Sequence, residues 1–226
     1  MRFAGHVLRA IDPAAAAGFY RRVFEGERLG GEIAVEPLPG PARARGAPSH
    51  WLGRLAVADV TAAVERVRAA GGLTLGPVSE ARAVCRDPGG AVFGLDAAPV
   101  ARGPFDWAAL HTDDARRATA FYGALTPADV GDPVALPGVG PVWPLRSAGA
   151  VLETAVLETV GRLPGVHPHW LFHAPVDDLD AALARVEAEG GRVIGAPTTA
   201  LDGLRVAACE DPEGAAFGLG RRDAAT

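Results

Sequence analysis

The stretch CRDPGGAVFGL occupies residues 85–95, and the stretch CEDPEGAAFGL occupies residues 209–219. Both contain a cysteine, an Asp-Pro-x-Gly turn and the ending Phe-Gly-Leu. Asp-Pro-x-Gly favours a turn, because proline presets φ and the Asp carboxylate can accept a hydrogen bond from the nearby backbone. A sequence motif of this length that occurs twice predicts an internal structural repeat, and such a repeat decides the fold.

A matching strand and helix are predicted ahead of each phrase. Residues 50–72 and 169–191 both begin with His-Trp-Leu and end with Gly-Gly. Asp59 and Asp178 fall at equivalent places and are predicted to be helix N-caps, since a carboxylate accepts from the N–H groups of the first turn. An apolar residue recurs every three or four positions after each cap, which indicates one buried helix face. The glycine pair ends each helix, because glycine adopts positive φ at no steric cost.

A second repeat precedes each of these segments. IDPAAAAGFYRRVF begins at residue 11 and DDARRATAFYGAL at residue 113. Asp12 and Asp114 are again predicted N-caps, and Phe-Tyr follows at the same distance on one helical face. The sequence therefore predicts four strand–helix–strands units at about residues 3–45, 50–97, 106–162 and 168–220. A linker near residues 97–105 predicts two domains, residues 1–100 and 101–226.

Composition excludes several partners. The net charge is −5 and no basic cluster occurs, which argues against nucleic-acid binding. No apolar run approaches the ~20 residues of a membrane span, and the N-terminal residues lack the apolar core of a signal peptide. The two cysteines occupy equivalent places in the repeated phrase, so we interpret them as buried and reduced. A cytoplasmic protein without nucleic-acid or membrane partners is expected, and a homodimer is compatible with the sequence.

Composition also excludes several chemistries. The chain contains no Lys, Asn or Gln, so a lysine Schiff base and an amide side chain in an oxyanion hole are both ruled out. Its three serines, Ser49, Ser79 and Ser147, lie outside any Gly-x-Ser-x-Gly motif. No glycine-rich strand-to-helix fingerprint predicts a dinucleotide or P-loop site.

The order of repeats resembles the vicinal oxygen chelate superfamily, which includes glyoxalase I, bleomycin-resistance proteins and extradiol dioxygenases. The resemblance implies an α+β fold of four βαβββ modules in two paired glyoxalase-like halves, whose curled sheets enclose cups. The motifs His-Trp-Leu and Asp-Pro-x-Gly-Ala-x-Phe-Gly-Leu are similar to those of tandem glyoxalase-like bacterial proteins often labelled hydroxylases. Residues 25–49 leave little room for three strands, so the first module is expected to be shortened.

The resemblance also implies where a metal site would lie. Metal-dependent members commonly carry a His seven residues before the capping acid and a Glu seven residues after the Asp of the Asp-Pro-x-Gly turn. Those positions hold residues without a metal-binding side chain: Gly5, Leu52, Trp107, Leu171, Gly94 and Gly218. Divalent metals need several converging N, O or S donors, so we expect neither a metal nor another cofactor. A relocated metal site using His111, His173 and a carboxylate such as Glu153 is the remaining alternative.

Histidines on the predicted strands provide candidate site residues. Residues two apart on a strand share a face. If the position seven residues before the cap faces the cup, Trp107, His111, His169 and His173 face it too. These four residues are the candidate ligand-binding set, and His111 and His173 are the candidate general bases. A purely structural role for them stays open, above all for His169, which belongs to the repeated His-Trp-Leu.

Three functions remain compatible with the sequence. The first is a metal-independent protein that binds a small, partly aromatic molecule in its cup, as bleomycin-resistance proteins do. The second is a glyoxalase-like hydroxylase, isomerase or lyase with His111 or His173 as general base, because imidazole suits that role near neutral pH. The third is a structural or assembly module with an empty cup. The Pro- and Gly-rich segment 130–144 is expected to be a loop near the pocket.

Overall fold

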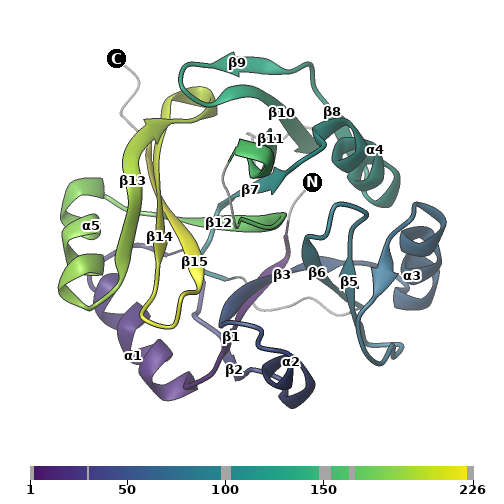
Figure 1. Cartoon of the computed structure of the whole chain (residues 1–226), viewed down its shortest axis with the longest axis horizontal. Helices are drawn as coiled ribbons and strands as arrows, with labels where there is room; N and C mark the ends of the chain where they lie inside the picture. The colour runs from purple at the N-terminus through teal and green to yellow at the C-terminus, as the bar shows by residue number, and fades with distance from the viewer. Residues whose placement is uncertain (1–2, 30, 98–102, 148–153, 163–165, 223–226) are drawn as a thin grey trace. The chain divides into compact units, whose positions relative to one another are not determined.

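The computed structural model of the chain (Figure 1) contains two compact units, and each is made from separate stretches of sequence. The described residues are 3–29, 31–97, 103–147, 154–162 and 166–222. The first unit is formed by residues 1–5, 53–100 and 107–171, and the second by residues 6–52, 101–106 and 172–226. Each unit thus combines segments from both halves of the sequence, while the predicted domain boundary near residue 100 stays a prediction.

The first unit holds two helices and two groups of paired strands. Its elements are β3 (His50–Ala56, from residue 53), α3 (Val60–Ala69), β4 (Leu73–Thr74), β5 (Arg82–Arg86), β6 (Val92–Asp96), β7 (Trp107–Thr112), α4 (Ala115–Leu125), β8 (Ala128–Val130), β9 (Val134–Leu136), β10 (Gly140–Ser147), β11 (Thr154–Glu158), a 3₁₀ turn (Val160–Arg162) and the start of β12 (His169–Pro175). One group has the order β3-β6-β5-β4, and the other has the order β7-β11-β10-β8, with β9 on β10. The pairs β3–β6 and β7–β11 are parallel.

The second unit follows the same plan with fewer strands in its first part. Its elements are β1 (Gly5–Ala10, from residue 6), α1 (Pro13–Val23), β2 (Val35–Pro37), α2 (Gly40–Ala44), the start of β3, the rest of β12, α5 (Leu179–Ala188), β13 (Arg192–Thr199), a 3₁₀ turn (Leu201–Gly203), β14 (Leu204–Glu210) and β15 (Ala216–Arg222). β1 and β2 are parallel, and β13, β14, β15 and β12 lie in that order.

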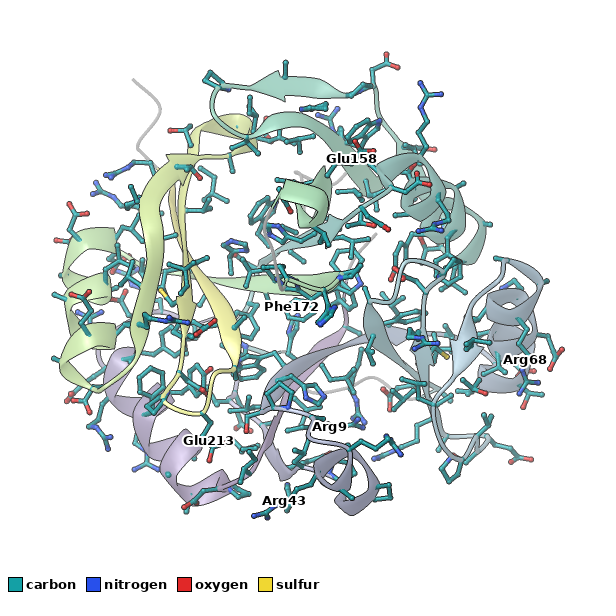
Figure 2. All side chains as sticks on the ribbon, in the orientation of Figure 1. Arg9, Arg43, Arg68, Glu158, Phe172 and Glu213 are labelled. Carbon is teal, nitrogen blue, oxygen red and sulfur yellow. The ribbon has the colours of Figure 1, made fainter. Side chains whose placement is uncertain are left out.

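The four predicted helix caps are confirmed. Asp12, Asp59, Asp114 and Asp178 each precede a helix and accept a backbone N–H of its first turn. Two glutamates, both labelled in Figure 2, add to this at α4 and α1. Glu158 accepts from the N–H of Ala115, and Glu213 accepts from the N–H groups of Ile11 and Asp12. Acidic oxygens at a helix N-terminus stabilise it through unsatisfied N–H groups and the helix dipole.

A buried three-residue network explains the repeated turn in the first unit. The indole Nε1 of Trp170 donates to the hydroxyl of Tyr122 on α4 at 2.9 Å, and this hydroxyl donates to Asp87 Oδ2 at 3.0 Å. Asp87 Oδ1 accepts from the N–H groups of Gly90 and Ala91, which closes the Asp-Pro-x-Gly turn. Burial, together with the Asp87 charge, raises the pKa of Tyr122 well above its usual range, so its hydroxyl keeps the proton that it donates.

An equivalent network lies in the second unit. Trp51 Nε1 donates to the hydroxyl of Tyr20 on α1 at 2.9 Å, and Tyr20 donates to Asp211 Oδ2 at 3.2 Å. Asp211 Oδ1 accepts from the N–H groups of Glu213 and Ala215. Both tryptophans thus pack against a tyrosine of a helix, and each Asp-Pro-x-Gly carboxylate joins a turn to the helix of another repeat.

Two further expectations meet the structure differently. Cys85 and Cys209 are buried and form no disulfide with each other, as expected. The prediction of a loop at 130–144 is wrong for much of its length, because β9 and part of β10 form a hairpin there. Gly138, with φ of 74°, supplies the turn between these strands. No helix in the described part of the chain is long and apolar enough to cross a bilayer.

Candidate functional site

His111 on β7 and His169 on β12 form a stacked pair in the first unit. Their ring centroids lie 5.0 Å apart, and the ring planes differ by 8°. Trp170 follows His169 on the strand and contacts Tyr122 of α4. Because successive residues of a strand point to opposite faces, the two histidines lie on the strand face turned away from α4.

Hydrogen bonds at Nδ1 orient both imidazoles. His169 Nδ1 lies 2.8 Å from the carbonyl oxygen of His167. A carbonyl can only accept, so His169 Nδ1 carries the proton and its Nε2 keeps a lone pair. His111 Nδ1 lies 2.7 Å from Thr159 Oγ1, and the N–H of Thr159 donates to the carbonyl of Thr112. The site therefore presents at least one imidazole nitrogen, Nε2 of His169, as a hydrogen-bond acceptor.

Burial favours the neutral form of both imidazoles. Burial, reinforced by the neighbouring His169, lowers the pKa of His111 to about 3. Burial also lowers the pKa of His169, and the bond to the His167 carbonyl only partly offsets this effect. Two cationic rings in such a stack would repel each other, so the neutral forms are the ones compatible with this geometry.

Trp107 and His173, the other two predicted site residues, occupy buried positions. Trp107 lies on β7, two positions from Ala109 and four from His111, so alternation places it on the same strand face as His111. His173 belongs to the second unit, where it pairs with Gly218 of β15. A Cβ atom at residue 218 would overlap the imidazole of His173, so the glycine makes room for this ring. The structure brings His111 and His169 together, and a joint role for all four residues stays a prediction.

The equivalent positions in the first half of the sequence carry different groups. Arg54 of β3 pairs with Gly94 of β6, where an added Cβ would lie 3.2 Å from Arg54 Cγ. Arg54 Nε forms an ion pair with Asp96 Oδ2 at 3.2 Å, and both residues are buried. His50 matches His169 in one respect, because its Nδ1 lies 2.9 Å from the carbonyl oxygen of Pro48.

Sequence reasoning missed two parts of this arrangement. Thr159 follows β11 and gave no motif signal. The Arg54–Asp96 pair could have been found by aligning the repeats, which sets Arg54 against His173 and Asp96 against Gly220. Residues that differ between otherwise matching repeats are the signal in this case.

Comparison with known sequences establishes the family. The model of the Glyoxalase/Bleomycin resistance protein/Dioxygenase superfamily matches residues 105–219. CFP32 of Mycobacterium bovis, provisionally named a glyoxylase, is 32% identical over 243 residues, covering 94% of this chain and 91% of that protein. The anthracycline biosynthesis protein DauV of Streptomyces sp. (strain C5) is 35% identical over 195 residues, covering 77% of this chain and 66% of DauV. The chain belongs to the glyoxalase/bleomycin resistance/dioxygenase superfamily.

Solved structures share the fold at low sequence identity. The 2,3-dioxygenase LapB from Pseudomonas sp. KL28 aligns with a TM-score of 0.64 at 14% identity, covering 97% of this chain and 91% of that chain. The Mn(II)-bound glyoxalase from Novosphingobium aromaticivorans aligns with a TM-score of 0.63 at 15% identity, covering 98% and 82%. These similarities confirm the predicted α+β fold with two glyoxalase-like halves, and they carry no further conclusion about activity.

The residues at the inherited ligand positions do not fit a metal ion. Leu52, Trp107 and Leu171 offer no side-chain atom that binds a metal, and the space beside Gly218 is filled by the His173 ring. Within the described residues, no group of three His, Cys, Asp or Glu side chains lies close enough to hold a metal. The relocated site that uses Glu153 falls outside the described residues.

Proposed function

We propose that the chain binds a small, partly aromatic organic molecule without a metal ion, at the strand face that carries His111 and His169. The observation that carries this proposal is the stacked imidazole pair. The outer face of one stacked ring can take an aromatic group, and His169 Nε2 offers an acceptor for a hydroxyl group. Neutral imidazoles also admit an uncharged ligand at low desolvation cost.

Metal independence is part of the proposal. Three convergent protein ligands are the minimum of a typical catalytic zinc or iron site, and the positions that the superfamily commonly uses hold leucine, tryptophan and glycine here. The histidine pair carries four ring nitrogens, and Nδ1 of each ring is already engaged with Thr159 or His167, which leaves only two for a metal. Recognition by stacking and hydrogen bonding accounts for these residues with no need for a metal.

Catalysis by His111 is the less well supported alternative. An effective general base has a pKa near the working pH, whereas burial lowers the pKa of His111 to about 3. His173 stays a candidate base on the sequence argument alone. The names of DauV and its relative DnrV place them in anthracycline biosynthesis, which favours a role with a small organic molecule over a purely structural module.

Ligand binding can be tested in two stages. Native mass spectrometry of the chain purified from its own host should detect a co-purifying organic molecule and well under one equivalent of metal. Binding of 2-naphthol, which can stack and donate, should then exceed binding of 2-methoxynaphthalene, which can stack but not donate. His169→Ala should weaken 2-naphthol binding by roughly fivefold, the usual worth of one hydrogen bond.

His50→Ala is the matched control, because His50 has the same bond from Nδ1 to a backbone carbonyl. It should leave 2-naphthol binding unchanged. An equal loss in both variants, or one tightly bound metal ion per chain whose removal by EDTA lowers the melting temperature, would count against the proposal.

A further inference from the structure

Strands β4 and β5 of the first unit expose apolar side chains on one face. Helix α3 packs against β4 and β5 from the opposite side (Figure 1). Ala83, Cys85 and Phe93 are buried there. Leu73 is 51% exposed and Leu75 is 39% exposed. Two exposed leucines at alternate positions of one strand edge form an apolar strip, whereas single exposed leucines would need no explanation.

Two arginines lie on the same strand face as the leucines. Leu73 pairs with Arg86, and the N–H of Leu75 donates to the carbonyl of Val84. Paired residues share a face, and so do residues 82, 84 and 86 along β5. The face therefore carries Leu73 of β4, and Leu75 directly after it, beside Arg82, Val84 and Arg86 of β5. We call it the β4–β5 face.

The arginines of this face are available for an anion. Both are exposed, and no carboxylate of the described residues lies within ion-pair distance of either guanidinium. Asp96 pairs with Arg82 in the strand register, but its Oδ2 lies beside the buried Arg54. Ser79 fixes the start of β5, because its Oγ accepts from the N–H of Arg82. On α3, by contrast, Arg68 is paired with Glu65.

We infer that the β4–β5 face binds an amphipathic organic anion, with its apolar body on Leu73 and Leu75 and its acidic group between Arg82 and Arg86. Arginine suits carboxylate and phosphate groups, because its planar fork donates two parallel hydrogen bonds. The two Cα atoms lie about 13 Å apart along the strand, so both long side chains can reach one acidic group. A second copy docked by the same face would oppose arginine to arginine, which favours a small anion as the occupant.

Calorimetric titration with three ten-carbon probes tests this inference: decanoate, decyl phosphate and decanol, each below its aggregation concentration. Both anions should bind the wild-type chain with a stoichiometry near one, and decanol should bind at least roughly tenfold more weakly. The ratio of decanoate to decyl phosphate affinity shows which acidic group fits better. Higher salt should weaken the anions and leave decanol unchanged.

Variants assign the binding to the face. Arg82→Gln/Arg86→Gln should reduce decanoate affinity roughly tenfold or more, and Leu73→Ser/Leu75→Ser should reduce both decanoate and decanol binding. Arg68→Gln, on the α3 side, is the matched control and should change nothing. All changed side chains are exposed, so circular dichroism should report an unaltered fold.

Two results would overturn the inference. One is equal decanoate binding by the wild-type chain and Arg82→Gln/Arg86→Gln. The other is a dimer that dissociates in Leu73→Ser/Leu75→Ser while no probe binds the wild-type chain, since this would assign the face to a second copy. His169→Ala should leave decanoate binding intact, which separates this site from the proposed aromatic site.

Discussion

Trp170 and Trp51 occupy equivalent strand positions and make equivalent contacts, whereas the residues three places further along the strands do not. Each tryptophan donates to a tyrosine that donates to the carboxylate of an Asp-Pro-x-Gly turn. On the other strand face, His173 rests on Gly218, while Arg54 rests on Gly94 and forms a buried ion pair with Asp96. The two halves thus match on the helix side and differ on the opposite side.

The difference has a physical reason. A buried network of indole, hydroxyl and carboxylate leaves a polar group without a partner when any one member is changed. The opposite face needs only shape and charge balance, so a glycine beside a large side chain can accept either imidazole or guanidinium. Differences in ligand chemistry between the two halves should therefore be sought on this opposite face.

Removal of the Arg54 guanidinium should give the largest effect. Arg54→Met takes a cation from beside the buried Asp96 carboxylate and should destabilise the chain by about 3–5 kcal/mol. The same substitution at Arg68, which pairs with Glu65 on the surface, should cost less than about 1 kcal/mol. Urea unfolding at neutral pH measures both values. Equal losses would show that the Arg54 pair is as well solvated as the surface pair.

Loss of a tyrosine hydroxyl should have the next largest effect and should be similar in the two units. Tyr122→Phe leaves Trp170 Nε1 without its acceptor and Asp87 without the donated hydroxyl, which should cost about 2–3 kcal/mol. Tyr20→Phe should cost a similar amount, because its bonds to Trp51 and Asp211 are equivalent. Free energies of unfolding measure both losses. A difference of more than about 1.5 kcal/mol between the two variants would show that the two networks are not equivalent.

A methyl group added at Gly218 or Gly94 should give the smallest difference in stability between the two halves. Gly218→Ala must displace the His173 ring and should destabilise the chain by about 1–2 kcal/mol. Gly94→Ala meets the flexible stem of Arg54 at 3.2 Å and should cost less than about 1 kcal/mol. Thermal unfolding checks the order, and addition of His173→Ala to Gly218→Ala should recover part of the loss. The reverse order would show that Arg54 is held more rigidly than His173.

Local sequence signals predicted the framework well. The four Asp caps, the buried Phe-Tyr pairs and the turns all follow from short-range rules that act within a few residues. The superfamily was recognisable because these signals recur in a fixed order. The loop prediction for residues 130–144 failed because strand pairing outweighed a Pro- and Gly-rich composition: Pro141 and Pro144 lie within β10.

Long-range partners could not be predicted in the same way. The turn motif around Asp87 explains its hydrogen bonds to the backbone, but it does not indicate that the Tyr122 hydroxyl donates to Asp87 Oδ2. Likewise, the alternation around β11 does not show that Glu158 caps α4 or that Thr159 meets His111. Such contacts depend on how separate repeats pack, which periodicity within one repeat does not contain.

The interleaved composition of the two units has a consequence for synthesis on the ribosome. Tyr122 follows its partner Asp87 by 35 residues, whereas Tyr20 waits 191 residues for Asp211. Since chains fold as they emerge, the first unit can close while the apolar side of α1, with Phe19 and Tyr20, has yet to meet its turn. The apolar side chains of the first helix thus wait for β15, where Phe217 contacts Tyr20, and until then they can favour aggregation of the nascent chain.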